Sequence, residues 1–298
     1  MSRPRLSVII PVYNARDTIE GCLGSLEGRL DEGRDEIIVV DSSSDGTAGL
    51  VARRFPHVRL FTFPERKYPG DARNFAIAQA QGEILAFIDA DCVAAPDWAE
   101  QIVAAHEGGD PVMGGILEIA NPESRVSWAQ YFCEFSRWMA GTPGGETSEI
   151  PGVCLSLKRW VFDKYGPFLE GVLCADTAFN WRLVEGGIRR LIVPSIRISH
   201  VNIDRLGLLL RKQIIHGGFF ARVRAAERGF FLPRRLIYAA GSPALPLLLT
   251  YRIVRRVLSR RTYVRELFRA MPLVLLACTF WSLGEMLGYL RGGAGVKA

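Results

Sequence analysis

Apolar runs and helical patterns alternate along the first third of this chain. Short apolar runs bounded by polar residues are typical of buried strands, and they occur here at residues 6–12, 36–40, 58–63 and 83–88. The stretches that begin at Asp17, Thr47 and Asp71 carry apolar residues at helical spacing and separate these runs. The β-α-β-α-β-α-β order predicts an α/β fold with a mostly parallel sheet and helices on both faces.

The middle of the chain has a less regular pattern. Helices are predicted at residues 96–106, 125–139 and 174–185, and strands at residues 111–119, 153–157 and 189–200. Residues 141–149 are rich in glycine and threonine, so we expect a mobile loop there.

Two apolar runs lie near the C-terminal end. Residues 271–290 have about the length needed to cross a bilayer, and Glu285 is their one charged residue. Residues 236–251 are shorter and contain two prolines, which favours a re-entrant or interfacial segment. Two buried helices of a soluble domain are the alternative. We expect a catalytic domain at residues 1–204 and a membrane-associated region at residues 205–298.

Positive charge is concentrated in the same region. The net charge is +6, but residues 205–270 carry 15 Lys/Arg against 2 Asp/Glu. A basic belt can bind nucleic acid or anionic lipid. The flanking apolar runs favour membrane lipids, and no nucleic acid is expected as a partner.

The N-terminal sequence and the cysteine spacing indicate in which cellular compartment the main domain works. Residues 1–14 contain a short apolar run without a small-residue cleavage site, so no secretory signal peptide is expected. The six cysteines show no Cys-x-x-Cys spacing, which argues against a zinc site and a disulfide framework. We expect a reducing, cytoplasmic setting for the main domain.

Two carboxylates follow the fourth predicted strand. Asp89 and Asp91 stand one residue apart at the end of a buried run, where their like charges repel each other. A hard divalent cation would compensate that repulsion and would also bind phosphate oxygens. In isolation, such a pair more often shapes a turn or caps a helix; its place at the carboxyl end of a strand favours a metal site.

The second predicted strand also ends on acidic and hydroxyl residues. Asp41, at the end of this strand, could accept hydrogen bonds from a base N–H or from a ribose hydroxyl. Equally, Asp41 and Asp45 could merely shape the turn and cap the next helix.

Together these segments resemble family 2 glycosyltransferases of the GT-A fold. The blocks are SVIIPVYN at residues 7–14, VVDSSSDGT at 39–47, ARN at 72–74 and GEILAFIDAD at 82–91. Their order and spacing are specific, and the resemblance covers residues 5–200. It implies a nucleotide-diphosphate-sugar transferase fold, a UDP- or GDP-sugar donor, and Mn²⁺ or Mg²⁺.

The resemblance also implies roles for particular residues. Pro11, Tyr13 and Asp41 would line the nucleotide pocket, Arg73 would lie by the donor, and Asp89 and Asp91 would serve the ribose and the metal. One departure from the family pattern is Ser42, where relatives often have a second aspartate. This leaves the base and ribose contacts less well defined than the metal site.

A later block resembles the acceptor side of the family. Residues 151–159 (PGVCLSLKR) and 165–168 (YGPF) are similar to the segment that shapes the acceptor site, and Asp176 corresponds to the general base. In an inverting transfer, such a carboxylate takes the proton of the acceptor hydroxyl. The glutamate that usually precedes it is Ala175 here. The alternative role for Asp176 is that of a helix N-terminal carboxylate favoured by the dipole.

His200, at the end of the last predicted strand, is a minor candidate for the site. Imidazole can coordinate a metal or, when protonated, pair with phosphate. A lone histidine in such a position is more often structural.

The resemblance implies an inverting glycosyltransferase, and the basic, apolar C-terminal region leads us to expect it at the cytoplasmic face of the inner or another membrane. Its acceptor would be a lipid-linked or cell-surface glycan, as in cell-envelope glycan biosynthesis. One alternative is transfer to a polyprenyl phosphate, and another is a non-catalytic membrane adaptor with a nucleotide-binding fold. A nucleotidyltransferase is disfavoured because no glycine- and lysine-rich phosphate loop follows the first strand.

Overall fold

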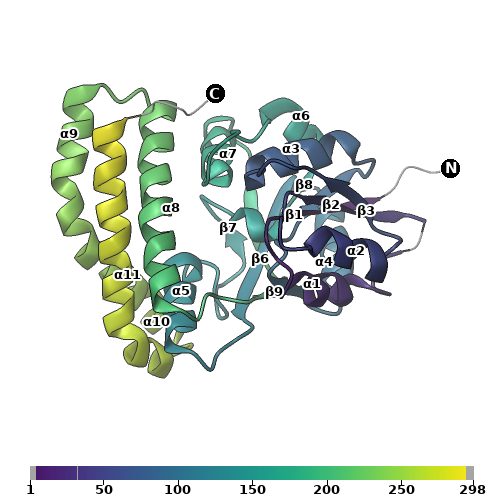
Figure 1. Ribbon diagram of the computed structural model, residues 1–298, viewed down its shortest axis with the longest axis horizontal. Coiled ribbons are helices and arrows are strands. Elements are labelled where there is room, and N and C mark those ends of the chain that lie inside the picture. The colour runs from purple at the N-terminus through teal and green to yellow at the C-terminus, as the bar shows by residue number, and fades with distance from the viewer. Residues whose placement is uncertain (1–4, 32, 293–298) are drawn as a thin grey trace. The chain divides into compact units, whose positions relative to one another are not determined.

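The computed structural model describes residues 5–31 and 33–292 and divides the chain into two compact units (Figure 1). Unit 1 comprises Met1–Glu118, Pro143–Gly171 and Ala175–His200, and unit 2 comprises Ile119–Thr142, Val172–Cys174 and Val201–Ala298. Residues 1–4, 32 and 293–298 of these ranges lie outside the described residues.

A single mixed sheet forms the centre of unit 1. Its strands run in the order β3-β2-β1-β4-β8-β6-β9-β5, and β7 pairs with β9. The strands are β1 (Leu6–Val12), β2 (Asp35–Asp41), β3 (Arg59–Thr62), β4 (Ile84–Phe87), β5 (Cys92–Ala94), β6 (Val112–Ile119), β7 (Gly145–Glu146), β8 (Leu155–Lys158) and β9 (Arg190–His200).

The N-terminal half of this sheet confirms the predicted alternation. β1 pairs in parallel with both β2 and β4, and β2 pairs in parallel with β3. The crossovers are α1 (Ile19–Leu26), α2 (Thr47–Arg54) and α3 (Pro69–Gln79). In Figure 1, α3 covers one face of the sheet, and α1 and α2 cover the other. β1 is buried on both faces, as expected for a central parallel strand.

Antiparallel pairings complete the sheet. β8 pairs antiparallel with β4 and β6, and β5 pairs antiparallel with β9. The helices of this half are α4 (Trp98–Glu107), α6 (Arg159–Tyr165) and α7 (Ala175–Glu185), with the 3₁₀ turn η1 (Gly152–Cys154) before β8. The three-residue strand β5 was not predicted, because no periodicity can be recognised over so short a segment.

The loop predicted at residues 141–149 is partly wrong. Gly145 and Glu146 form β7, which pairs with β9 through Gly145↔Ile192 and Glu146↔Leu191. The glycine- and threonine-rich composition conceals this strand, because the backbone pairing is with a partner more than 40 residues away.

Helices make up unit 2. They are α5 (Arg125–Phe135), α8 (Leu206–Glu227), α9 (Leu232–Gly241), the 3₁₀ turn η2 (Ser242–Ala244), α10 (Leu245–Arg260) and α11 (Val264–Arg291). In Figure 1, α11 lies between α8 and α9. Small residues allow close approach: a Cβ atom on Gly284 of α11 would lie 2.1 Å from the carbonyl oxygen of Ile214 on α8.

Among its described residues, unit 2 contains two helical segments that are long and apolar enough to cross a membrane. They are Leu232–Arg260, with a mean hydropathy of 1.2, and Val264–Arg291, with 1.6. These segments include the predicted apolar runs, residues 236–251 and 271–290. The compact units differ from the predicted domains because residues 119–142 pack with the C-terminal helices. The division at residue 204 stays a prediction about function, and residues 293–298 lie outside the described residues.

Candidate active site

The candidate residues of unit 1 lie where strands of the parallel half end. Pro11 and Tyr13 are at the end of β1, Asp41 is the last residue of β2, and Asp89 follows β4. Carboxyl ends of parallel strands share one edge of the sheet, and ligands of such sheets bind there. The register pairs Val12 with Asp41, so Tyr13 continues directly beside the end of β2.

Asp41 is the buried acid of this edge. It is 1% exposed, and its Oδ1 accepts a hydrogen bond from the backbone N–H of Ser43 at 2.8 Å. Its Oδ2 is buried without a hydrogen-bond partner among the described residues. A buried acceptor left unpaired is costly. This oxygen is therefore a ready acceptor for the N–H or hydroxyl group of a ligand.

Asn14 ties the ends of β1 and β2 together, a role that the sequence reasoning missed. Its backbone N–H donates to Ser43 Oγ at 2.7 Å, and its Oδ1 accepts from the N–H of Ser44 at 3.0 Å. Asn14 has a φ of 50°, in the left-handed region that asparagine tolerates better than most residues. An asparagine directly after a buried strand was the available signal.

Arg73 and Asp89 form the ion pair at the centre of the edge. Arg73, on α3, is 4% exposed, and its Nη2 donates to Asp89 Oδ1 at 2.7 Å. Burial raises the pKa of Asp89, and the nearby Arg73 lowers it. Arg73 was predicted to lie by the donor, and in the structure it lies beside the Asp89 carboxylate. The Asp89 side chain is about one-third exposed.

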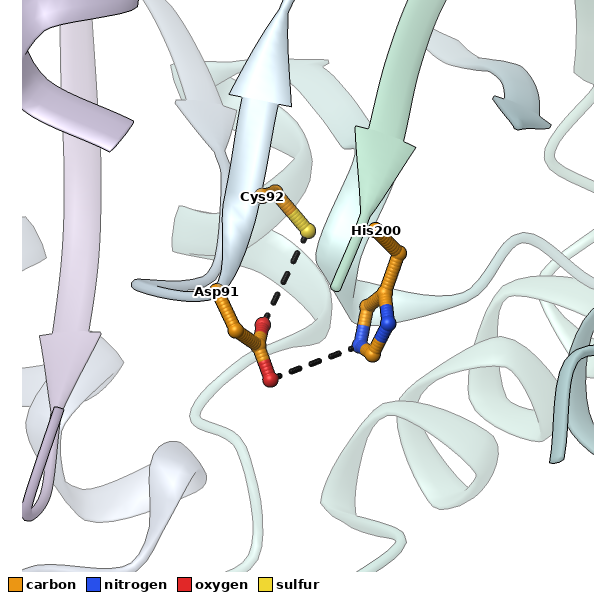
Figure 2. A group of neighbouring side chains, drawn as sticks. All are labelled: Asp91, Cys92 and His200. Atoms are coloured by element: carbon orange, nitrogen blue, oxygen red, sulfur yellow. Dashed lines mark hydrogen bonds and ion pairs between the residues drawn. The ribbon is translucent and has the colours of Figure 1, made fainter. Parts of the chain in front are cut away.

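Asp91 lies beside Cys92 and His200 (Figure 2). Asp91 Oδ2 is 3.4 Å from His200 Nε2, and Cys92 Sγ is 3.7 Å from Asp91 Oδ1. Ligand atoms of the three residues all lie within 4.8 Å of one another. The pairing of Cys92 with His200 between β5 and β9 brings them together.

Two donors of this group, the Asp91 carboxylate and the His200 imidazole, fit a divalent cation such as Mn²⁺. The Cys92 thiol is a soft donor, and burial raises its pKa, so it does not suit this ion. The Asp91 side chain is 43% exposed and is therefore accessible to a bound ion. His200, a minor candidate from the sequence, lies in this group, and so does Cys92, which was not predicted. Asp89 pairs with Arg73, and its assignment to the metal stays a prediction, as do those of Asp91 and His200.

Asp176 lies in the first turn of α7 and is connected to the ion pair through Gly152. Its Oδ2 accepts from the backbone N–H of Gly152 at 2.8 Å, and its Oδ1 accepts from the N–H of Thr177 at 3.0 Å. A Cβ atom on Gly152 would lie 2.5 Å from Arg73 Nη1. Only glycine therefore permits this close approach of η1 to Arg73. Asp176 also acts electrostatically on Asp89.

Known proteins share this architecture. The mannosyltransferase PcManGT from Pyrobaculum calidifontis, solved with GDP-Man and Mn²⁺, superposes with a TM-score of 0.56 at 22% identity over 94% of this chain and 88% of its own. This similarity identifies the fold as GT-A.

Sequence comparison identifies the family. The profile described as Glycosyl transferase family 2 matches residues 7–165. The glycosyltransferase AglE of Haloferax volcanii is 30% identical over 217 residues, which cover 70% of this chain and 71% of AglE. The succinoglycan biosynthesis protein ExoO of Rhizobium meliloti is 29% identical over 124 residues, 41% of this chain and 36% of ExoO. The chain belongs to glycosyltransferase family 2.

Proposed function

We propose that this chain is an inverting, metal-dependent glycosyltransferase. It transfers a sugar from a UDP- or GDP-sugar to a lipid-linked or cell-surface glycan at the cytoplasmic face of a membrane. The proposal rests on one observation: three polar groups lie near one another at the carboxyl edge of the sheet. These are the unpaired Asp41 oxygen, the Arg73–Asp89 ion pair and, through Gly152, Asp176.

The nucleotide is assigned to the ends of β1 and β2. Asp41 Oδ2 would accept a hydrogen bond from the base, Tyr13 would offer its half-exposed ring for stacking, and Pro11 would line the same pocket. Asp89 would accept from a ribose hydroxyl, and Arg73 would hold its carboxylate in place. The GDP-Man bound to PcManGT supports a nucleotide-sugar donor here.

Asp91 and His200 would hold the divalent cation, with Asp89 nearby. When bound, the ion neutralises negative charge that develops on the departing nucleoside diphosphate. The Mn²⁺ in PcManGT supports Mn²⁺ or Mg²⁺ as cofactor. Burial of His200 between strands fixes its ring, with 6% of the side chain exposed, so its Nε2 is directed at Asp91.

Asp176 would act as the general base. Its carboxylate would take the proton of the acceptor hydroxyl as that oxygen forms a bond to the anomeric carbon of the sugar. The bond from that carbon to the diphosphate breaks on the opposite face, and the anomeric configuration inverts. The two backbone N–H groups on Asp176 would keep the carboxylate oriented for this step.

The properties of unit 2 support an acceptor at a membrane. We assign residues 1–204 to catalysis and residues 205–298 to membrane attachment. Val264–Arg291 would span or insert deeply, and the segment around residues 236–251 would stay embedded without crossing. If both crossed, the arginines at residues 252–269 would lie opposite the catalytic domain, against the positive-inside tendency. Protease accessibility of a tag after Ala298 tests this topology.

A polyprenyl phosphate is the second candidate acceptor. Both oxygens of Asp176 already accept backbone hydrogen bonds, which also suits a positioning role at the start of α7. A phosphate acceptor is already anionic and needs no base. Under this version Asp176→Asn would retain much of the activity.

Hydrolysis of nucleotide sugars tests the enzymatic proposal directly. The full chain would be incubated with a panel of UDP- and GDP-sugars and Mn²⁺, and release of the nucleoside diphosphate would be measured against Asp91→Ala. We expect manganese-dependent turnover of one donor and its loss in Asp91→Ala. No turnover together with no donor binding would sink the enzyme proposal and favour a non-catalytic adaptor.

A further inference from the structure

The loop between β3 and α3 carries two cations beside the proposed nucleotide pocket. This loop, residues 63–68, contains Arg66 and Lys67. The Phe63 backbone N–H donates to the Asp41 carbonyl oxygen at 2.8 Å, and the Lys67 N–H donates to Ser42 Oγ at 3.0 Å. The loop is therefore fixed to the end of β2, where Asp41 has its unpaired oxygen.

Both cations rest on aromatic rings. The guanidinium carbon of Arg66 lies 4.3 Å from the ring centroid of Tyr13 and 4.9 Å from that of Tyr68. Lys67 Nζ lies 4.8 Å from the ring of Phe63. In the described part of the chain, neither cation has a carboxylate within 4.0 Å. Arg73, in contrast, forms an ion pair with Asp89.

Cationic side chains held only by aromatic rings can leave these rings and bind an anion at little cost. Cation–π contacts at exposed positions are weak, whereas charge-assisted hydrogen bonds to phosphate are strong and can be bidentate for arginine. The side chains of this edge carry a net negative charge, because Asp89, Asp91 and Asp176 outnumber Arg73. A diphosphate bound there would therefore need cationic groups besides the divalent ion. Such a diphosphate would attract the two loop cations.

We propose that Arg66, assisted by Lys67, binds the diphosphate of the nucleotide-sugar donor. In the free protein, the Arg66 guanidinium covers a ring face of Tyr13. On donor binding it moves to the diphosphate, and the base stacks on the ring that it leaves. This inference rests on the proposed function, since it assigns a further binding residue to the same donor site.

The number of phosphates in the ligand provides the test. Titration calorimetry in Mn²⁺ would give dissociation constants of the full chain for UDP, UMP, GDP and GMP. We expect Arg66→Ala to weaken binding of the preferred diphosphate about tenfold and of its monophosphate clearly less. Arg66→Lys should recover part of the loss. Because Arg66 is exposed, these variants should fold, and an unchanged melting temperature checks this.

A matched control is Arg53→Ala, which alters an exposed arginine in the last turn of α2, away from the carboxyl ends of the strands. It should leave all dissociation constants unchanged. An unaltered diphosphate affinity in Arg66→Ala would overturn the inference, and so would equal weakening for mono- and diphosphate. If Asp41→Asn still weakened binding in either case, the proposed donor site would stand. A wild-type chain that binds neither UDP nor GDP would overturn both.

Discussion

The two units of this chain differ in how many large hydrophobic side chains they expose. In unit 1, four large hydrophobic side chains are exposed: Tyr13, Val93, Trp160 and Val184. All other exposed large hydrophobics of the described residues belong to unit 2, and Ile237 and Leu247 reach 71% and 72%. Unit 2 thus exposes many more large apolar side chains than unit 1, as the proposed attachment of unit 2 to a membrane requires.

Polar groups differ in the same way. Unit 1 keeps an unpaired buried oxygen on Asp41 and ion pairs of limited exposure at one edge of its sheet. In unit 2, the Glu134 carboxylate on α5 accepts hydrogen bonds from Lys212 and Gln213 of α8. The unpaired Asp41 oxygen at the strand ends is available to a ligand, whereas the Glu134 carboxylate is already paired. This difference supports the proposal that unit 1 carries the chemistry and unit 2 the attachment.

Replacing the proposed base has the largest expected effect on unit 1. Asp176→Asn removes the proton acceptor and should lower the rate of transfer to a hydroxyl acceptor by about 10³-fold, with donor affinity little changed. The exposed Asp163 of α6 gives the control Asp163→Asn, which should behave as wild type. Transfer rates with a saturating donor decide the matter. Substantial residual activity would contradict the base and favour a phosphate acceptor.

Charges on the exposed face of unit 2 should reduce membrane attachment next most strongly. Ile237→Glu combined with Leu247→Glu should lower vesicle partitioning about a hundredfold, because carboxylates are poorly accommodated in lipid. Trp160→Glu and Val184→Glu expose the same charge on unit 1 and should have no effect. Cosedimentation with anionic vesicles measures both pairs. Equal losses in the two pairs would break the distinction between the units.

A buried histidine should make the stability of unit 1 depend on pH. His106, on α4, is 3% exposed and shares a 3.0 Å hydrogen bond with Ser156 Oγ. Burial lowers its pKa from 6.5 to about 4. The unfolded chain therefore binds more protons between these values, and stability decreases as the pH falls through this window.

The expected loss from His106 is about 2 kcal/mol between pH 7 and pH 5. His106→Gln should remove this component, and replacement of the exposed His57 by Gln should not. The pH dependence of the melting temperature in detergent measures it. Identical pH profiles for wild type and His106→Gln would show that His106 contributes nothing.

The smallest effect concerns the glycine between the ion pair and Asp176. In Gly152→Ala, the new methyl group would displace the end of the Arg73 side chain from Asp89, and we expect activity to decrease about tenfold together with a loss of stability, because Arg73 is buried. Gly24→Ala on α1 is the control, because a Cβ atom there meets nothing within 4 Å. Kinetics and melting temperatures of the two variants separate the effects. A fully active Gly152→Ala would contradict the connection.

Hydrophobic periodicity predicts the parallel half of the sheet almost completely. β1, β2 and β4 are buried on both faces and therefore appear as continuous apolar runs. β5 and β7 could not be predicted in this way, because three and two residues carry no periodicity and depend on pairing with the distant β9. Short antiparallel additions are fixed by tertiary pairing.

The candidate site shows the same limit on what the sequence can predict. Asp41, Asp89 and Asp91 could be assigned because each follows a predicted strand. Cys92 and Arg66 could not: the position of Cys92 beside His200 depends on the β5–β9 register, and that of Arg66 depends on a loop that folds back onto Tyr13. Asp176 was found through the family resemblance. Its link to Arg73 depends on the backbone of Gly152, which no spacing rule describes.

The central claim is that the strand ends of unit 1 bind a nucleotide sugar together with a divalent cation. The melting temperature of the full chain, measured with a panel of nucleotide sugars with and without Mn²⁺, tests it most directly. We predict that one UDP- or GDP-sugar raises the melting temperature only when Mn²⁺ is present, and that Asp91→Asn abolishes the rise. A melting temperature that no nucleotide sugar raises, or a rise that persists in Asp91→Asn, would contradict the claim.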